Sequence, residues 1–220
     1  MAATKAIERP RPLKVQSAYD TLKRLIVTLE LAPGSHLDER ELMDTLSIGR
    51  TPLREAMLRL SHERMIVHVP RRGARVADLS LLDLQEMIEA RTHIEPLVTK
   101  LAAKRVTDGL LIRLEALMID IEAAGAARDI ERLVNRDLEF HTVIARACDN
   151  RYFASMAEQV NTAMLRFWHV SYAGMAGLPL SVDHHRALFE TLAARDPGTA
   201  EQRSLDHIEI FRERMSKFVG

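Results

Sequence analysis

Residues 66–76 show the strand-turn-strand pattern of this chain, and this pattern limits the fold classes that the chain can adopt. Apolar and β-branched residues at 66–69 and 74–76 flank a turn that contains Pro70, Arg71, Arg72 and Gly73. Before and after this hairpin, apolar residues recur at helical spacing. A single short hairpin among helices cannot provide a sheet large enough to form a core by itself. The sequence therefore predicts a mainly α protein with a small β-hairpin.

Three helices are expected before the hairpin. The first extends from Ser17 to before the Pro33-Gly34 turn. The second covers residues 38–46, with Asp38 as N-cap and Glu41 completing a capping box. The third covers residues 50–62, with Thr51 as the predicted N-cap and Pro52 as the first helical residue. Its predicted buried side consists of Leu53, Met57, Leu58 and Leu60. Three helices and a basic hairpin make a winged helix-turn-helix, whose second motif helix lies in the DNA major groove.

Charge is distributed unevenly along the chain, although its formal net charge is zero. Residues 1–78 hold 14 lysines and arginines against 10 acidic residues, whereas the remaining residues hold 17 against 21. Seven arginines and only two glutamates lie between residues 50 and 75. A local patch of this kind either binds phosphate or is a solvated arginine-rich face, and charge alone favours neither.

Two domains are expected from 220 residues of which 47% are hydrophobic. Residues 1–14 are interpreted as a flexible basic tail and 15–78 as the winged helix-turn-helix. Residues 79–220 are interpreted as an all-α antiparallel bundle of about six helices, at 80–104, 107–125, 129–147, 151–172, 181–195 and 197–217. A single cysteine, Cys148, excludes an intramolecular disulfide, and no long apolar run predicts a membrane span. A cytoplasmic protein is expected.

Three motifs in the first domain closely resemble the DNA-binding domain of GntR-family regulators. They are LAPGSHL at 31–37, EREL at 39–42 and GRTPLREA at 49–56, followed by the RRG of the wing at 71–73. The resemblance implies that Arg40, Arg50 and Arg54 contact DNA, that Thr51 contacts the DNA backbone and that Gly73 lies at the wing tip. An arginine fork suits guanine and a threonine suits phosphate, but which arginine reads a base is left open.

Two positions depart from the family pattern. Gly49 stands where the family usually has serine, so one phosphate contact is in doubt. Arg64 stands where it usually has glycine before the wing, so the entry into the wing is in doubt. The second half resembles the FCD (FadR/VanR-like) subgroup, which has a helical ligand-binding domain with a metal site in many members. Because six helices are expected here rather than seven, the domain is more similar to the VanR-type branch of this subgroup.

Several polar side chains fall on apolar helix faces of the second half. Asp137 and His141, four residues apart, share one such face, and His185 and His207 each lie among apolar residues of other helices. From spacing alone these are either hydrogen-bonded core residues or ligands of a divalent ion such as zinc or nickel. The FCD resemblance implies the ligand role. His184 is the alternative to His185, which is preferred because the family pattern has arginine after the histidine.

Two further residues are candidates for binding an effector. Arg91 lies on an apolar face, and its guanidinium suits the carboxylate of a small organic acid. An internal ion pair with Glu95, four residues on, is the alternative. Asn161 is a weaker candidate on the helix that carries Trp168.

These features predict a homodimeric, metabolite-responsive repressor that binds double-stranded DNA at an inverted repeat. They predict that the protein is not an enzyme. A metal-dependent hydrolase that uses the Asp/His cluster is the alternative, but no further acid or base lies near the four residues. A helical interaction module would leave Arg50, Arg54 and the wing unexplained.

Overall fold

The computed structural model describes residues 11–174 and 182–219. The chain divides into two compact units, one up to Asp78 and one from Leu79. Among the described residues, no helix is both long enough and apolar enough to cross a membrane.

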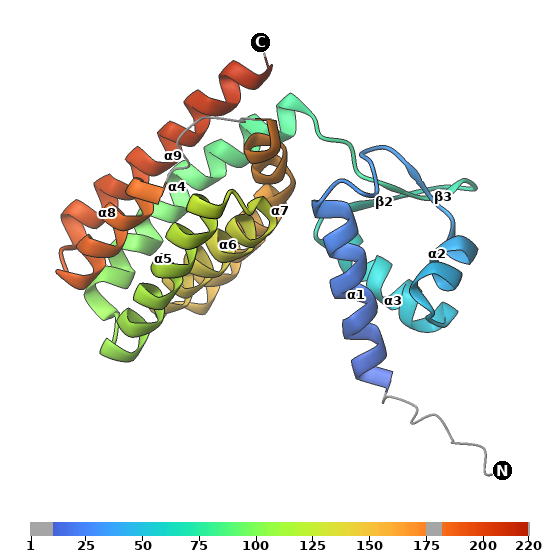
Figure 1. The fold of residues 1–220 in the computed structure, drawn as a ribbon, viewed down its shortest axis with the longest axis horizontal. Helices are drawn as coiled ribbons and strands as arrows, with labels where there is room; N and C mark the ends of the chain where they lie inside the picture. The colour runs from blue at the N-terminus through green and yellow to red at the C-terminus, as the bar shows by residue number, and fades with distance from the viewer. Residues whose placement is uncertain (1–10, 175–181, 220) are drawn as a thin grey trace. The chain divides into compact units, whose positions relative to one another are not determined.

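The first unit packs three helices against a small antiparallel sheet (Figure 1). The helices are α1 (Arg11–Val27), α2 (Glu39–Leu46) and α3 (Arg50–His62). The strands are β1 (His36–Leu37), β2 (Ile66–Val69) and β3 (Gly73–Val76), in the order β1-β3-β2. This arrangement confirms the predicted winged helix-turn-helix. The third strand, β1, was not expected, because two residues are too few to show an alternating pattern.

The core of this unit lies between α1 and α3. Leu22, Ile26, Leu53 and Leu60 are fully buried. The hydroxyl of Tyr19 in α1 donates to Glu63 Oε1 at 2.6 Å, which ties α1 to the end of α3. Apolar packing and this hydrogen bond therefore join α1 to α3.

Three details of the first unit differ from the sequence-based expectation. The first helix begins at Arg11 rather than Ser17, so residues 11–14 are helical and not part of a tail. Pro12 is tolerated because the first turn of a helix does not use its N–H groups. Leu58 is 53% exposed and does not belong to the buried side of α3, whose place is taken by Ala56.

The N-cap of α3 is the third difference. The cap is Gly49 and not Thr51, so Pro52 is the third helical residue instead of the first. A proline there still costs nothing, because the third N–H of a helix has no intrahelical partner. By contrast, Asp38 caps α2 as predicted, accepting from the backbone N–H groups of Arg40 and Glu41 at 2.7 and 3.0 Å.

The second unit is the predicted helical bundle. Within the described residues it contains six helices: α4 (Leu81–Arg105), α5 (Asp108–Ala127), α6 (Ile130–Ala147), α7 (Arg151–Gly174), α8 (Val182–Ala193) and α9 (Pro197–Val219). Each begins and ends within a few residues of its expected bounds; residue 181, expected in the fifth, lies outside the described residues.

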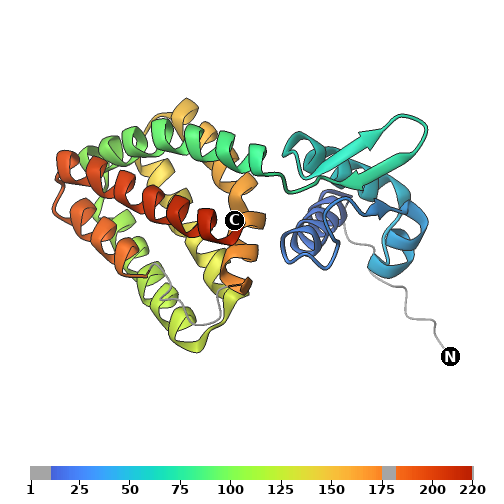
Figure 2. The ribbon, with the colours of Figure 1, turned by 90° about the horizontal axis from the view of Figure 1, so that it is seen from above.

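Helix α4 is central to the bundle. It packs against α6, α7, α8 and α9, and it runs beside α9 in both views of the ribbon (Figures 1 and 2). Apolar side chains of α5 and α6, among them Leu114, Met118, Ile121 and Phe140, are fully buried in one core. Helices α6, α8 and α9 thus converge on the interior of a well-packed bundle, which positions the polar residues they carry.

Candidate metal centre and DNA-binding surface

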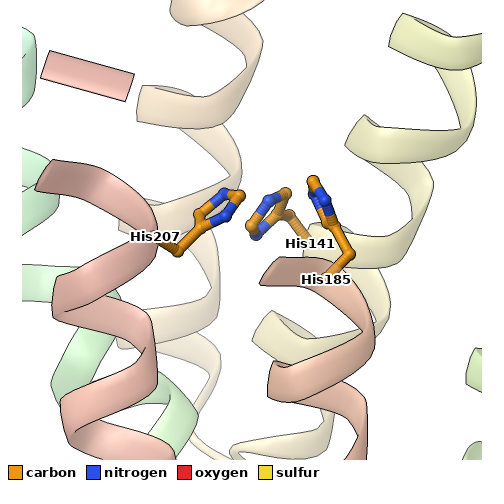
Figure 3. Close-up of side chains that lie close together, drawn as sticks. All are labelled: His141, His185 and His207. Atoms are coloured by element: carbon orange, nitrogen blue, oxygen red, sulfur yellow. The ribbon is translucent and has the colours of Figure 1, made fainter. Parts of the chain in front are cut away.

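Three imidazoles from three helices meet inside the bundle. His141 comes from α6, His185 from α8 and His207 from α9, and Figure 3 shows their rings turned toward one another. One ring nitrogen from each lies within 4.8 Å of the others. The three side chains are at least 93% buried, because their relative exposures are 5, 2 and 7%. The fold has therefore gathered three metal-ligating groups from positions as far as 66 residues apart in the chain.

Asp137 joins this cluster from the preceding turn of α6. Its Oδ1 lies 2.7 Å from His185 Nε2 and its Oδ2 lies 3.8 Å from His141 Nε2. Burial pushes the pKa of Asp137 upward, but His185 and His141 more than offset this and hold it below the usual value. Asp137 is therefore a carboxylate, the form that binds cations.

His141 and His207 are held in the neutral form that a metal requires. Burial is the main cause that lowers the pKa of His141 and, more strongly, of His207, in each case because the charged form loses its hydration. A neutral imidazole keeps a lone pair for a ligand. Among the described residues, His141 Nε2 and His207 Nδ1 are buried without a hydrogen-bond partner, which costs about 1–3 kcal/mol for each such group unless something binds it.

The donor set fits a divalent ion. Three imidazole nitrogens and one carboxylate are the ligands that zinc and similar ions take in proteins. In a tetrahedral site with metal–nitrogen bonds of about 2.0–2.1 Å, two ligand nitrogens lie about 3.3–3.4 Å apart, so the present spacing of up to 4.8 Å would contract around a bound ion. His184, the alternative to His185, is only partly buried and is not in the cluster.

Arg91 forms the ion pair that was its alternative interpretation. The fully buried guanidinium donates from Nε to Glu95 Oε1 at 2.6 Å and from Nη2 to Glu95 Oε2 at 3.1 Å. Its Nη1 has no hydrogen-bond partner among the described residues. Its Cζ lies 5.4 Å from the ring centre of Trp168 and 5.5 Å from that of Phe211. Glu95 therefore occupies one edge of the guanidinium, through Nε and Nη2, and leaves Nη1 for another group.

Trp168 connects the arginine to the histidines. Its ring stacks on His141, with 5.9 Å between ring centres, while Arg91 lies over the same tryptophan. Asn161 lies on α7 two turns before Trp168, buried, with its Oδ1 without a partner among the described residues. Sequence reasoning missed the roles of Trp168 and Phe211, although a sole tryptophan on an apolar face was a usable signal.

The residues expected to bind DNA are exposed on the first unit. Arg40 lies on α2, and Arg50, Thr51 and Arg54 lie along α3, all with exposed side chains. Arg54 Nε is 3.0 Å from both carboxylate oxygens of Glu39, a pair that sequence reasoning did not anticipate. Because Glu39 engages Nε, it fixes the side chain and leaves the two Nη nitrogens available for a base edge.

The tip of the wing is a short turn between β2 and β3. Residues 70–72 form it, with Arg71 at φ 62° and Gly73 at φ 82°. His36 Nε2 in β1 donates to the Arg72 carbonyl at 2.9 Å, and a Cβ on Gly73 would come within 3.2 Å of that same nitrogen. Glycine suits both this φ and this close approach, and Arg71 and Arg72 beside it are exposed.

The two residues that depart from the family pattern, Gly49 and Arg64, lie at the two ends of α3. Gly49 is the N-cap of α3 and supplies no side-chain hydrogen bond. Arg64 follows the C-cap of α3 with φ 58°, and Met65 N–H donates to Leu60 O at 2.9 Å as in a Schellman motif. Glycine is favoured at this left-handed position, so Arg64 carries backbone strain.

Comparison with known families agrees with this division. Residues 14–76 match the family of bacterial regulatory proteins described as gntR family, and residues 86–210 match the FCD domain. The two matches fall in the two structural units.

Individual proteins are similar to nearly the whole chain. It is 25% identical to the HTH-type transcriptional repressor RspR of Escherichia coli K12, covering 90% of this chain and 87% of that protein. It is also 25% identical to the galactonate operon transcriptional repressor of the same organism, covering 90% and 94%. The solved structure of E. coli McbR/YncC has the same fold, with a TM-score of 0.78 and 23% identity over 92% of this chain and 98% of that one.

Proposed function

The chain belongs to the GntR family of bacterial regulatory proteins and carries an FCD domain, and from this membership we propose that it is a homodimeric repressor. We further propose that its helical bundle binds a divalent metal and a small organic acid. Its family and its relatives are DNA-binding transcriptional regulators and not enzymes. The hydrolase alternative has no support. RspR and the galactonate operon regulator are named repressors, which favours repression here.

Exposed cations on three elements support the assignment of the DNA-binding residues. Arg40, Arg50 and Arg54 would face the major groove, while Arg71 and Arg72 at the wing tip reach the adjoining backbone or minor groove. Thr51 and the N-terminus of α3 offer donors to a phosphate. Since Arg54 is held at Nε by Glu39, it is the arginine we assign to a base, with its two Nη nitrogens directed at guanine.

An inverted repeat is the expected operator. One winged helix covers only a few base pairs, which is too short a sequence to select a site in a genome. Two copies related by a two-fold axis select DNA that has the same symmetry. We place the dimer contact in the helical unit.

The convergence of His141, His185 and His207 with Asp137 is the observation that carries the sensing part of the proposal. These four residues would hold zinc or nickel. A divalent ion there would act as a Lewis acid with coordination positions left for a carboxylate ligand. Because the four ligands come from α6, α8 and α9, binding would tie three helices together and stabilise the folded state.

A small carboxylate is the proposed effector. The unpartnered Nη1 of Arg91 suits one carboxylate oxygen, and Trp168, which contacts both Arg91 and His141, would form an apolar wall. Asn161 is the weaker contact. One relative regulates an operon named for galactonate, a carboxylate of this class. An acid that binds one arrangement of the helices better than another would shift the equilibrium between DNA-binding and released states.

Metal analysis tests the sensing proposal. We expect the purified protein to contain one divalent ion per chain and to melt at a lower temperature after chelation. The variants His141→Ala and His207→Ala should lose the metal and its effect on melting temperature, whereas His184→Ala, the matched control, should keep both. A wild-type protein that takes up no metal and melts identically with and without chelator contradicts the proposal.

A gel shift with the DNA upstream of the protein's own gene tests the regulatory proposal. We expect a saturable complex that requires an inverted repeat and weakens when a matching organic acid is added. Sedimentation should give two chains per particle. A monomer with and without DNA, or binding that ignores the repeat, contradicts this part.

A further inference from the structure

The outward face of α5 carries an apolar stripe. The helix packs against α6 and α8 with its buried side and lies at the surface of the bundle (Figures 1 and 2). Ile112 and Ile119 are 69% and 60% exposed, as is uncommon for isoleucine. The stripe consists of exposed residues at alternating spacings of three and four: Gly109, Ile112, Ala116, Ile119, Ala123 and Ala126.

This spacing is that of a helix seam that packs against another helix. Alternating steps of three and four keep a stripe on one line facing a partner helix. A solvated face needs no such regularity, and the other half of α5 already serves the core through Leu114, Met118 and Ile121. The stripe is thus a second packing face on the same helix.

The stripe is complementary to itself when the partner runs antiparallel. With a two-fold axis between residues 117 and 118, Ile112 faces Ala123 of a second copy, and Ala116 faces Ile119. Each large side chain then meets a small one, which lets the helices approach closely without collision. A parallel pairing would set isoleucine against isoleucine and alanine against alanine, leaving gaps between the larger contacts.

The charges along one border of the stripe match the same arrangement, whereas the other border is acidic, with Glu115 and Glu122. Along one border Arg113 comes first and Asp120 follows seven residues later, so the antiparallel copy brings its Asp120 toward Arg113 on both sides of the axis. Asp120 also pairs with Arg136 at 2.6 Å, and Arg113 with Glu139 at 2.8 Å. Charged rims around an apolar centre are the usual anatomy of a protein interface.

We propose that the α5 stripe is the dimer contact, in which two copies of this chain pair their α5 helices antiparallel across a two-fold axis. The proposal rests on the homodimer put forward above and specifies its face. It places the contact on α5 rather than on α7, whose exposed Tyr152 and Met156 form a shorter apolar pair.

Disulfide crosslinking tests the geometry in the full-length protein. The double variant Ile112→Cys with Ala123→Cys should oxidise to a covalent dimer, because each new thiol faces the other position of the partner. Neither single variant should do so, since equivalent positions 112 are about 16 Å apart along the axis and a disulfide needs Cα atoms within about 7 Å. The same 11-residue separation prevents a bond within one helix. Native Cys148 is fully buried, and the wild type is the control.

A charge placed in the stripe tests the energetics. Ile119→Arg should convert the dimer to monomers at micromolar concentration, while Met156→Arg on α7, a matched change at 49% exposure, should leave it intact. Both positions are exposed, so neither variant removes a core contact.

The outcomes separate this inference from the proposed function. Crosslinking of the double variant alone, with dissociation by Ile119→Arg, supports the α5 face. The α5 face is contradicted if the single variants crosslink, if no variant crosslinks, or if Met156→Arg dissociates the dimer in place of Ile119→Arg. In each of these cases a dimeric wild type still supports the homodimer. A monomeric wild type overturns both.

Discussion

The two units of this protein place their candidate functional residues in opposite environments. The winged helix-turn-helix exposes its cations on α2, α3 and the wing, whereas the bundle buries Asp137, three histidines and Arg91 among apolar helices. An exposed cation costs the fold little, because water and salt screen it. A buried polar group costs the fold free energy unless it is paired or bound. Function in the first unit should therefore be separable from stability, and in the second it should not.

The largest expected effect comes from breaking the buried pair in the bundle. Arg91→Met leaves the Glu95 carboxylate buried without its partner, and we expect the free energy of unfolding to fall by about 3–5 kcal/mol. Chemical denaturation measures this. Lys100→Met, which breaks the exposed pair with Glu201, is the control and should cost less than about 1 kcal/mol.

Replacing both partners sharpens the same test. Arg91→Met combined with Glu95→Leu removes both charges and should recover much of the lost stability. Equal small effects for the buried and exposed pairs would show that burial does not distinguish the two regions.

An intermediate effect is expected on DNA affinity. Arg54→Ala should weaken operator binding by about 1–3 kcal/mol and reduce discrimination between sites, while the free energy of unfolding stays nearly constant. Titration of matched and mismatched operators at fixed salt measures it. Arg146→Ala, which removes an exposed arginine from α6, should change neither. Retained affinity and specificity of Arg54→Ala would mean that α3 does not read the bases.

A smaller effect is expected at the end of α3. Arg64→Gly removes the strain of a left-handed residue in the Schellman motif and should stabilise the first unit by about 1 kcal/mol. Arg64→Ala keeps the same φ and removes the charge, so it is the control and should give no gain. A gain shared by both variants would trace the effect to the charge.

The smallest effect is expected at the start of α3. A Cβ on Gly49 meets Pro52 Cδ at an ordinary 3.8 Å, so Gly49→Ser fits and can cap the helix, which should add a few tenths of a kcal/mol. Gly49→Ala fits equally well but brings no oxygen. If alanine stabilises as much as serine, capping is not the cause.

Local rules predicted most of the secondary structure. Helical periodicity gave the six helices of the bundle, and the short side chain of Asp38 was sufficient to predict the cap of α2. The same rules went wrong where two of them compete. Both Gly49 and Thr51 can begin a helix, and Leu58 is apolar yet points outward, because the helix turns only one face toward α1.

The sequence by itself determined which side chains are unusual: an acid, three imidazoles and an arginine on apolar faces, and further arginines around a helix start and a hairpin. Tertiary structure decided which of them meet. Helical spacing relates Asp137 to His141, since both lie on α6, but only the packing of α8 and α9 brings His185 and His207 to them. It also decided that Arg91 is paired through two of its three guanidinium nitrogens. Periodicity fixes the face on which a residue lies, whereas distances between faces depend on how the whole core packs.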